Sequence, residues 1–208
     1  MRRSVFQWCL VLVAVVTIGM GWKYPLLGFV VPAVMLAGLI GGIIRGRWVC
    51  GNLCPRGSLF DRLISPISRK KPIPTFLRNM GFRWVVFLAL MGFLVFRLSQ
   101  NPTNLRHWGY TFWLMCTLTT GIGVILGVLY HPRIWCAFCP MGTVQNALGG
   151  GRYQLLIDSE ACIECGLCEK VCPLGLAIVK HREDGRLRDR DCAKCSECVV
   201  SCPKRALS

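Results

Sequence analysis

The stretch from Cys162 to Pro203 decides how this chain is organised, because it contains one cysteine pattern twice. The pattern is Cys-x2-Cys-x2-Cys-x3-Cys-Pro. Its copies read Cys162-Ile163-Glu164-Cys165-Gly166-Leu167-Cys168-Glu169-Lys170-Val171-Cys172-Pro173 and Cys192-Ala193-Lys194-Cys195-Ser196-Glu197-Cys198-Val199-Val200-Ser201-Cys202-Pro203. A [4Fe-4S] cube needs four thiolate ligands, and a tight loop with two-residue gaps reaches only three of its corners. The fourth cysteine of each copy is therefore expected to ligate the cluster of the other copy.

This reasoning divides the eight cysteines into two sets. The first set is Cys162, Cys165, Cys168 and Cys202, and the second is Cys192, Cys195, Cys198 and Cys172. Paired Cys-x2-Cys also builds tetrahedral zinc sites, but zinc requires neither the third cysteine nor the proline. The spacing is that of bacterial ferredoxins, so we predict an α+β two-cluster ferredoxin-like domain over residues 153–208.

The rest of the chain is strongly apolar. Of the 208 residues, 53% are hydrophobic and only 17% are charged, a composition typical of membrane proteins. Four apolar runs lie at 5–21, 26–44, 84–98 and 110–130. Three of them are close to 20 residues long, enough to cross a bilayer as a helix, and the run at 84–98 is the shortest. We therefore predict a membrane α-helical bundle with four transmembrane helices over residues 1–152.

The positive charge is concentrated beside the apolar runs. A net charge of +15 would suggest nucleic acid in a soluble protein, but here topology and anionic lipid headgroups explain it, so no nucleic-acid partner is expected. The loop at 45–83 carries nine Lys and Arg residues against one acid, Asp61. The positive-inside rule predicts that this loop, both termini and every cluster lie on the cytoplasmic side of a bacterial or archaeal cytoplasmic membrane. A reducing cytoplasm also suits a chain with 14 cysteines in mostly metal-ligand spacings.

An internal repeat follows the second and fourth apolar runs. Both copies read Arg-x2-Cys, a short gap, then Cys-Pro-x-Gly-Ser/Thr, beginning at Arg47 and at Arg133. Two spans separate the copies, so both emerge on one face of the membrane. The cysteines of the repeat are Cys50, Cys54, Cys136 and Cys139. We predict that they ligate a third iron–sulfur cluster; the alternative is two independent cysteine pairs.

Other residues within or near the spans have simpler interpretations. Cys9 and Cys116 stand alone and are expected to behave as small buried apolar residues. A possible quinone would place its polar head at an interface, near the cysteine loops and His131, or near His107 and its aromatic neighbours. An ordinary aromatic belt is the alternative at the second location.

Two Cys-Pro loops on a four-helix membrane domain, followed by a two-cluster segment, resemble the NapH-type polyferredoxin membrane proteins. That family includes NapH, MauN and the C-terminal half of NosR, and its loops usually read Cys-x3-Cys-Pro, as Cys50 to Pro55 does. The resemblance implies the electron-transfer subunit of a quinol dehydrogenase-type oxidoreductase complex, passing electrons between the quinone pool and a redox partner. It also implies sister subunits of a respiratory complex and a possible soluble electron carrier, without a catalytic side chain.

Two other functions fit the same motifs. A cluster-containing metal (copper) reductase or assembly factor would also carry Cys-Pro loops and a ferredoxin segment. A redox-sensing membrane anchor would use the clusters without turnover. Basic residues of the C-terminal segment favour an acidic partner or form a solvated face. They are Lys170, Lys180, Arg182, Arg186, Arg188 and Lys204.

Overall fold

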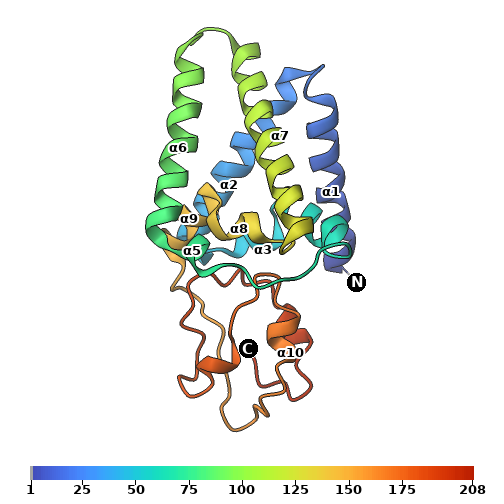
Figure 1. Ribbon diagram of the computed structural model, residues 1–208, viewed down its shortest axis with the longest axis vertical. Coiled ribbons are helices and arrows are strands. Elements are labelled where there is room, and N and C mark those ends of the chain that lie inside the picture. Colours follow the sequence, from blue (N-terminus) through green and yellow to red (C-terminus); the bar gives the residue numbers. More distant parts are fainter. Residues whose placement is uncertain (1) are drawn as a thin grey trace.

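The structure, a computed structural model, describes residues 2–208, with side chains from residue 5 onward. The molecule has three layers along its longest axis (Figure 1). Four long helices form the first, a group of short helices lies across one end of them, and the C-terminal segment is packed beneath the short helices. The short helices therefore lie between the apolar bundle and the ferredoxin-type segment.

The long helices are α1 (Arg2–Met20), α2 (Val30–Arg45), α6 (Met80–Ser99) and α7 (Leu105–Leu129). A 3-10 turn, η1 (Pro25–Phe29), leads into α2. By length and composition, three stretches among the described residues could cross a membrane: Pro25–Arg45, Met80–Ser99 and Leu105–Leu129. Three of the four predicted spans are thus confirmed as helices long and apolar enough to cross a membrane, while the apolar part of α1, Val5–Met20, is shorter.

The third span begins earlier than the apolar run predicts. The side chain of Asn79 caps the first turn of α6 by accepting a hydrogen bond from the Gly81 amide at 2.9 Å. Arg83 lies in this first turn and is fully buried, with ion-pair and hydrogen-bond partners inside the protein. A charged residue at the start of the span is tolerated because it points into the protein and is paired there.

The short helices repeat in order. After α2 come α3 (Trp48–Asn52) and α4 (Pro55–Leu59), which continues into the π-helical turn η2 (Phe60–Ile64). After α7 come α8 (Ile134–Phe138) and α9 (Pro140–Gly149). A further short helix in the basic loop, α5 (Thr75–Arg78), precedes α6.

The bundle shows apolar side chains both inside and outside. Phe60 and Trp135, from the two repeated units, lie in one buried cluster with Phe138. Large apolar side chains also point outward from the long helices, among them Leu12, Leu36, Val85 and Ile125, each at least 59% exposed. Soluble monomers rarely expose such continuous apolar surface, which agrees with a location in the bilayer.

The prediction of an α+β domain at the C-terminus is wrong. Within residues 2–208 no strand is present; this segment contains α10 (Leu167–Lys170), η3 (Val179–His181) and α11 (Glu197–Val200). Two isolated antiparallel bridges, Leu156 with Arg186 and Ile157 with Leu207, are all that remains of a sheet. The extended stretches are short, because residues with positive backbone φ angles, Tyr153, Gly185 and Arg205, lie beside the paired residues.

Candidate iron–sulfur cluster sites

The second cysteine of each repeat begins a helix. Cys54 is the residue before α4 and Cys139 the residue before α9, and each is followed by proline at the first helical position. Proline suits this position because its fixed φ is helical and the missing N–H would have no partner there. The Cys-Pro dipeptide therefore stops one helix and starts the next, which turns the cysteine toward the centre of the molecule.

The four cysteines of the repeats meet at one place. All four line a cavity of about 190 Å³ that also reaches between the long helices. Burial raises the pKa of Cys50 and that of Cys136 to about 12, and it also raises the pKa of Cys54. These thiols stay protonated at neutral pH until a metal displaces the proton.

The spacing Arg-x2-Cys, which both repeats share, is explained by contacts between the two repeats. Arg47 of the first repeat donates through Nη2 to the carbonyl of Cys136 in the second, at 2.7 Å. Arg133 of the second repeat donates through Nη1 to the carbonyl of Cys50 in the first, at 2.9 Å. Each arginine is almost completely buried. Each half of the repeat thus fixes the cysteine loop of the other half.

The glycine of each repeat makes room for this exchange. A Cβ atom added at Gly142 would lie 2.9 Å from Nη2 of Arg47, and one added at Gly57 would lie 3.2 Å from Nη1 of Arg133. Contacts this close would require the guanidinium to move. The pattern Cys-Pro-x-Gly is therefore a requirement of the arginine in the opposite repeat.

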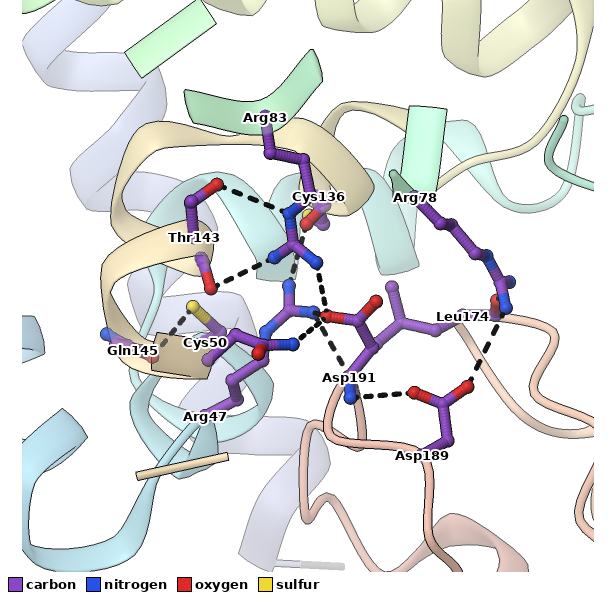
Figure 2. Close-up of polar contacts among 12 residues, drawn as sticks. Arg47, Cys50, Arg78, Arg83, Cys136, Thr143, Gln145, Leu174, Asp189 and Asp191 are labelled. Atoms are coloured by element: carbon purple, nitrogen blue, oxygen red, sulfur yellow. Dashed lines mark hydrogen bonds and ion pairs between the residues drawn. The ribbon is translucent and has the colours of Figure 1, made fainter. Parts of the chain in front are cut away.

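Each crossing arginine also holds a carboxylate. Arg133 binds both oxygens of Asp61 in a bidentate pair, at 2.7 and 2.6 Å. Arg47 binds Oδ1 of Asp191 at 2.6 Å, and Arg83 binds the same oxygen at 2.8 Å (Figure 2). Burial alone would raise the pKa of Asp191, but the two guanidiniums hold it below its ordinary value. Asp191 is therefore ionised. It belongs to the C-terminal segment, where it directly precedes Cys192.

The charges around the loop cysteines suit an anionic group. Four guanidiniums lie around the two loops, those of Arg47, Arg56, Arg83 and Arg133, and two carboxylates, Asp61 and Asp191, pair with three of them. Four positive and two negative charges leave an excess of two positive charges. A [4Fe-4S] cluster with four thiolates carries two negative charges in its oxidised form, so the residues fit this group.

Two buried donors near the cavity have no partner within the described part of the chain. They are Nε of Arg47 and Nε1 of Trp135, and both residues line the cavity. A buried N–H group without an acceptor is costly, whereas cluster sulfurs accept hydrogen bonds that tune the cluster potential. These donors are a second observation in favour of a sulfur-rich anion between the loops.

The eight C-terminal cysteines form the two sets that the spacing predicts. Cys162, Cys165, Cys168 and Cys202 line one small cavity together. In the other set, burial raises the pKa of Cys192 to about 11 and that of Cys198 to about 12. The nearby thiols of Cys172 and Cys195 contribute to both pKa increases. The fourth cysteine of each copy thus lies with the opposite copy, and ligation itself stays a prediction.

The second of these sets lies against the membrane domain. The backbone at Gly51, one residue after Cys50, is so close to the Ala193 carbonyl that a Cβ could not fit. Asn52 donates to the carbonyl of Lys194 at 3.2 Å, and Lys194 donates to the carbonyl of Arg45 at 3.0 Å. The loop after Cys192 therefore packs directly on the loop after Cys50.

No group of three or more His, Cys, Asp or Glu side chains in the described part of the chain is spaced to hold a single metal ion. The sulfurs of a tetrahedral zinc site would all lie about 2.3 Å from one ion. A cluster separates its four sulfurs across the corners of a cube and does not require such convergence.

The remaining sequence candidates divide clearly. Cys9 is exposed on the outside of α1, so the expectation that it is buried is wrong. Cys116 lies at the cavity, where its Sγ accepts a long hydrogen bond from Arg56 at 3.4 Å. His107 contacts the carbonyl of Arg97 at 2.8 Å, and Trp108 donates to that of Asn101 at 3.2 Å. Their polar atoms are thus engaged at the end of the bundle remote from the cysteines.

Sequence reasoning missed several residues that shape the site. Asp191, Arg83 and Gln145 lie outside every cysteine motif, yet all three are buried beside the loops. Gln145 lies 3.0 Å from the Cys50 sulfur and donates to the carbonyl of Gly38 at 2.9 Å. Its position one turn after the Cys-Pro-x-Gly motif was the available signal.

Comparison with known proteins agrees with this division of the chain. Residues 27–74 and 111–155 match a family model described as a 4Fe-4S binding domain, and residues 161–207 match a 4Fe-4S dicluster domain. No solved structure matches.

Three relatives match most of the chain. Two uncharacterized proteins of Methanocaldococcus jannaschii are 27% identical over 82% of this chain and 67% of theirs, and 28% identical over 80% and 73%. YccM of Escherichia coli, a candidate electron transport protein, is 25% identical over 88% of this chain, which spans 58% of that protein. The chain thus carries ferredoxin-type 4Fe-4S domains in both its membrane-associated part and its C-terminal segment.

Proposed function

We propose that this protein is a membrane electron-transfer subunit that carries electrons between the quinone pool and a redox partner through three [4Fe-4S] clusters. Two clusters are held by the C-terminal sets of four cysteines over residues 153–208. The third is held by Cys50, Cys54, Cys136 and Cys139 of the membrane domain, residues 1–152. Bound clusters supply one-electron transfer, and the potential of each depends on charge and hydrogen bonds around its sulfurs.

One observation carries this proposal: the loop that follows Cys50 packs against the loop that follows Cys192. Gly51 and Ala193 lie in direct backbone contact, so two predicted cluster sites adjoin at the end of an apolar bundle. The other C-terminal set includes Cys165, which is exposed to solvent. The three sites are therefore arranged from the bundle outward, with the exposed one at the end where a partner can approach.

The quinone site proposed here is the part of that cavity that extends from the loop cysteines between the long helices. Its walls are apolar side chains of α1, α2, α6 and α7, including Val34, Leu94 and Phe112. Arg56 borders it, and its Nη2 lies 3.4 Å from both the carbonyl oxygen and Sγ of Cys116. A quinone carbonyl in the cavity would accept a hydrogen bond from this guanidinium. Oxidation of one quinol would release two electrons to the clusters and two protons to water.

The remaining features of the proposal concern the membrane and the partner. We propose that α1 is the fourth span, since it lies alongside the other long helices (Figure 1). Apolar residues on it, including Val5, Leu12 and Val15, are more than half exposed. The basic loop and the C-terminal segment would then face the cytoplasm. Exposed basic residues of that segment would favour an acidic carrier or sister subunit; they are Lys170, Lys180, Arg186, Arg188 and Lys204.

Iron and sulfide analysis of the full chain, reconstituted anaerobically in detergent, tests the third cluster. We expect about twelve iron atoms per chain, falling to about eight in Cys50→Ser. Cys9→Ser is the matched control and should retain all twelve, because Cys9 lies on the outer face of α1. Eight iron atoms in the unaltered protein would refute the loop cluster.

Reduction of the clusters by a quinol, followed by their optical bleaching and EPR signal, tests the function itself. Arg56→Gln should slow reduction by quinol, measured per iron bound, more than it slows reduction by dithionite. Clusters that quinol does not reduce in the presence of sister subunits would contradict the proposal. Reduction of Cu(II) without any quinone would favour the metal reductase in its place.

A further inference from the structure

A buried carboxylate joins the C-terminal segment to both halves of the membrane domain. Oδ1 of Asp191 accepts hydrogen bonds from Arg47 and Arg83, at 2.6 and 2.8 Å (Figure 2). It also accepts one from Asn146, at 2.6 Å. These three donors come from the first cysteine loop, from α6 and from α9. A single oxygen atom therefore connects three elements of the membrane domain to the residue that precedes Cys192.

The two arginines that bind Asp191 continue toward the loop cysteines. Arg47 donates its other terminal nitrogen to the carbonyl of Cys136 at 2.7 Å. Arg83 donates to the carbonyl of Gly142 at 3.2 Å and to the hydroxyl of Thr143 at 3.3 Å, within the helix that starts after Cys139. The same charged group thus contacts the C-terminal cysteine loop on one side and the second membrane loop on the other.

The charge balance of this group is uneven. Arg47 and Arg83 contribute two positive charges, and Asp191 cancels one of them. Arg83 is fully buried and Arg47 nearly so, so water screens the remaining charge poorly. A reduced cluster carries one more negative charge than an oxidised one, and uncancelled positive charge nearby favours reduction.

We propose that Asp191 is a positioning residue that holds the Cys192 loop against the membrane loops and, with Arg83, sets the reduction potentials of the two adjoining clusters. This inference rests on the proposed loop cluster. It assigns a role to a residue outside every cysteine motif. It also predicts effects of opposite sign for two residues that touch each other.

The sign of each effect follows from the charge removed. Asp191→Asn keeps an acceptor oxygen but leaves both guanidiniums uncancelled, so the potentials should rise. Arg83→Gln removes one of the positive charges, so the potentials should fall. A unit charge about 10 Å away, at an effective dielectric constant of about 20, changes such an equilibrium on the order of tenfold. Tenfold corresponds to about 59 mV for a one-electron couple.

The experiment is an EPR-monitored redox titration of the full chain with its clusters. The loop-cluster signal is identified as the one lost in Cys50→Ser. We expect a rise of about 59 mV in Asp191→Asn and a fall of similar size in Arg83→Gln, while Arg83→Lys stays close to the unaltered protein. Asp189→Asn is the matched control for the loss of one carboxylate, because Asp189 is partly exposed and its Arg78 partner is 4.0 Å distant, while asparagine keeps the oxygen that accepts from the Asp191 amide at 2.8 Å.

The possible results separate the two proposals. Eight iron atoms in the unaltered protein would overturn the loop cluster and this inference together. Twelve iron atoms with potentials that move no more than in Asp189→Asn would overturn only the role of Asp191. Should Asp191→Asn fail to fold, the comparison of Arg83→Gln, which lowers the potentials, with Arg83→Lys, which keeps them, decides; equal potentials in those two variants would refute the inference.

Discussion

Replacing Asp61 by asparagine should destabilise the membrane domain strongly, although the change removes only one charge. Asp61 binds Arg133 in a bidentate pair at 2.7 and 2.6 Å, and the arginine side chain is only 1% exposed. Asparagine has one acceptor oxygen, so one of the two hydrogen bonds is lost and a buried guanidinium loses its counter-charge. Arg133 keeps its bond to the carbonyl of Cys50, so it cannot simply turn toward water.

The size of the effect follows from burial. Breaking a buried ion pair by removing one partner costs roughly 3 to 5 kcal/mol. The Asp61 side chain is 18% exposed, so water screens part of the interaction and about 3 kcal/mol is the better value. For a chain of this length, that loss lowers the melting temperature by about 6 to 12 °C.

Thermal unfolding in detergent, followed by tryptophan fluorescence, measures this loss. Glu164→Gln is the control, because it breaks an exposed pair with Arg182 at 2.7 Å whose partners are 35% and 55% exposed. Such surface pairs contribute about 0 to 1 kcal/mol. A double-mutant cycle of Asp61→Asn with Arg133→Gln should give a coupling energy of about 2 kcal/mol. Equal melting temperatures for Asp61→Asn and Glu164→Gln would refute the reasoning.

Three further results are expected. Gly142→Ala should cost about 1 to 3 kcal/mol of stability, because its new methyl displaces the Arg47 guanidinium. Gly92→Ala is the control and should keep its stability, because the space around Gly92 is open. Equal melting curves for the two variants would contradict this prediction. His131 has a pKa lowered to about 4, first by burial and then by nearby positive charges. As the pH falls, His131 of the unfolded chain is therefore protonated first, near pH 6.5. The free energy of unfolding should fall by about 2 kcal/mol from pH 8 to pH 5. His131→Gln should abolish this loss, and an equal loss in that variant would refute the assignment. In cluster-free protein Cys50, with its pKa near 12, should resist iodoacetamide at pH 8; labelling as fast as in the unfolded chain, read by mass spectrometry, would show that the thiol is not buried.

The cysteine spacings predicted the grouping of residues well, because a cluster imposes its geometry on the chain locally. The spacing placed Cys172 with the second copy and Cys202 with the first, and the structure brings them together in that way. The repeat also predicted that two loops 86 residues apart would meet, since two helices of similar length return the chain to the same end.

The sequence could not predict which acids would pair with the arginines of the repeat. Asp191 is 144 residues from Arg47, and the two residues meet only because the C-terminal segment packs on the cysteine loops. The same packing explains the early start of α6, because Arg83 is neutralised there and its charge no longer ends the apolar span. The strands were predicted from ferredoxin architecture, whereas the paired backbone at Leu156 and Ile157 is too short and too bent to form them.

The crosswise contacts of Arg47 and Arg133 have a consequence for the origin of this chain. The arginine of each unit contacts the first cysteine of the other unit. Such reciprocal contacts are typical of a two-fold symmetric dimer. Duplication of a unit with two helices and one Cys-Pro loop accounts for this exchange, and neither unit completes its own cysteine loop. The acids break the symmetry, because Asp61 lies within the basic loop whereas Asp191 comes from the C-terminal segment.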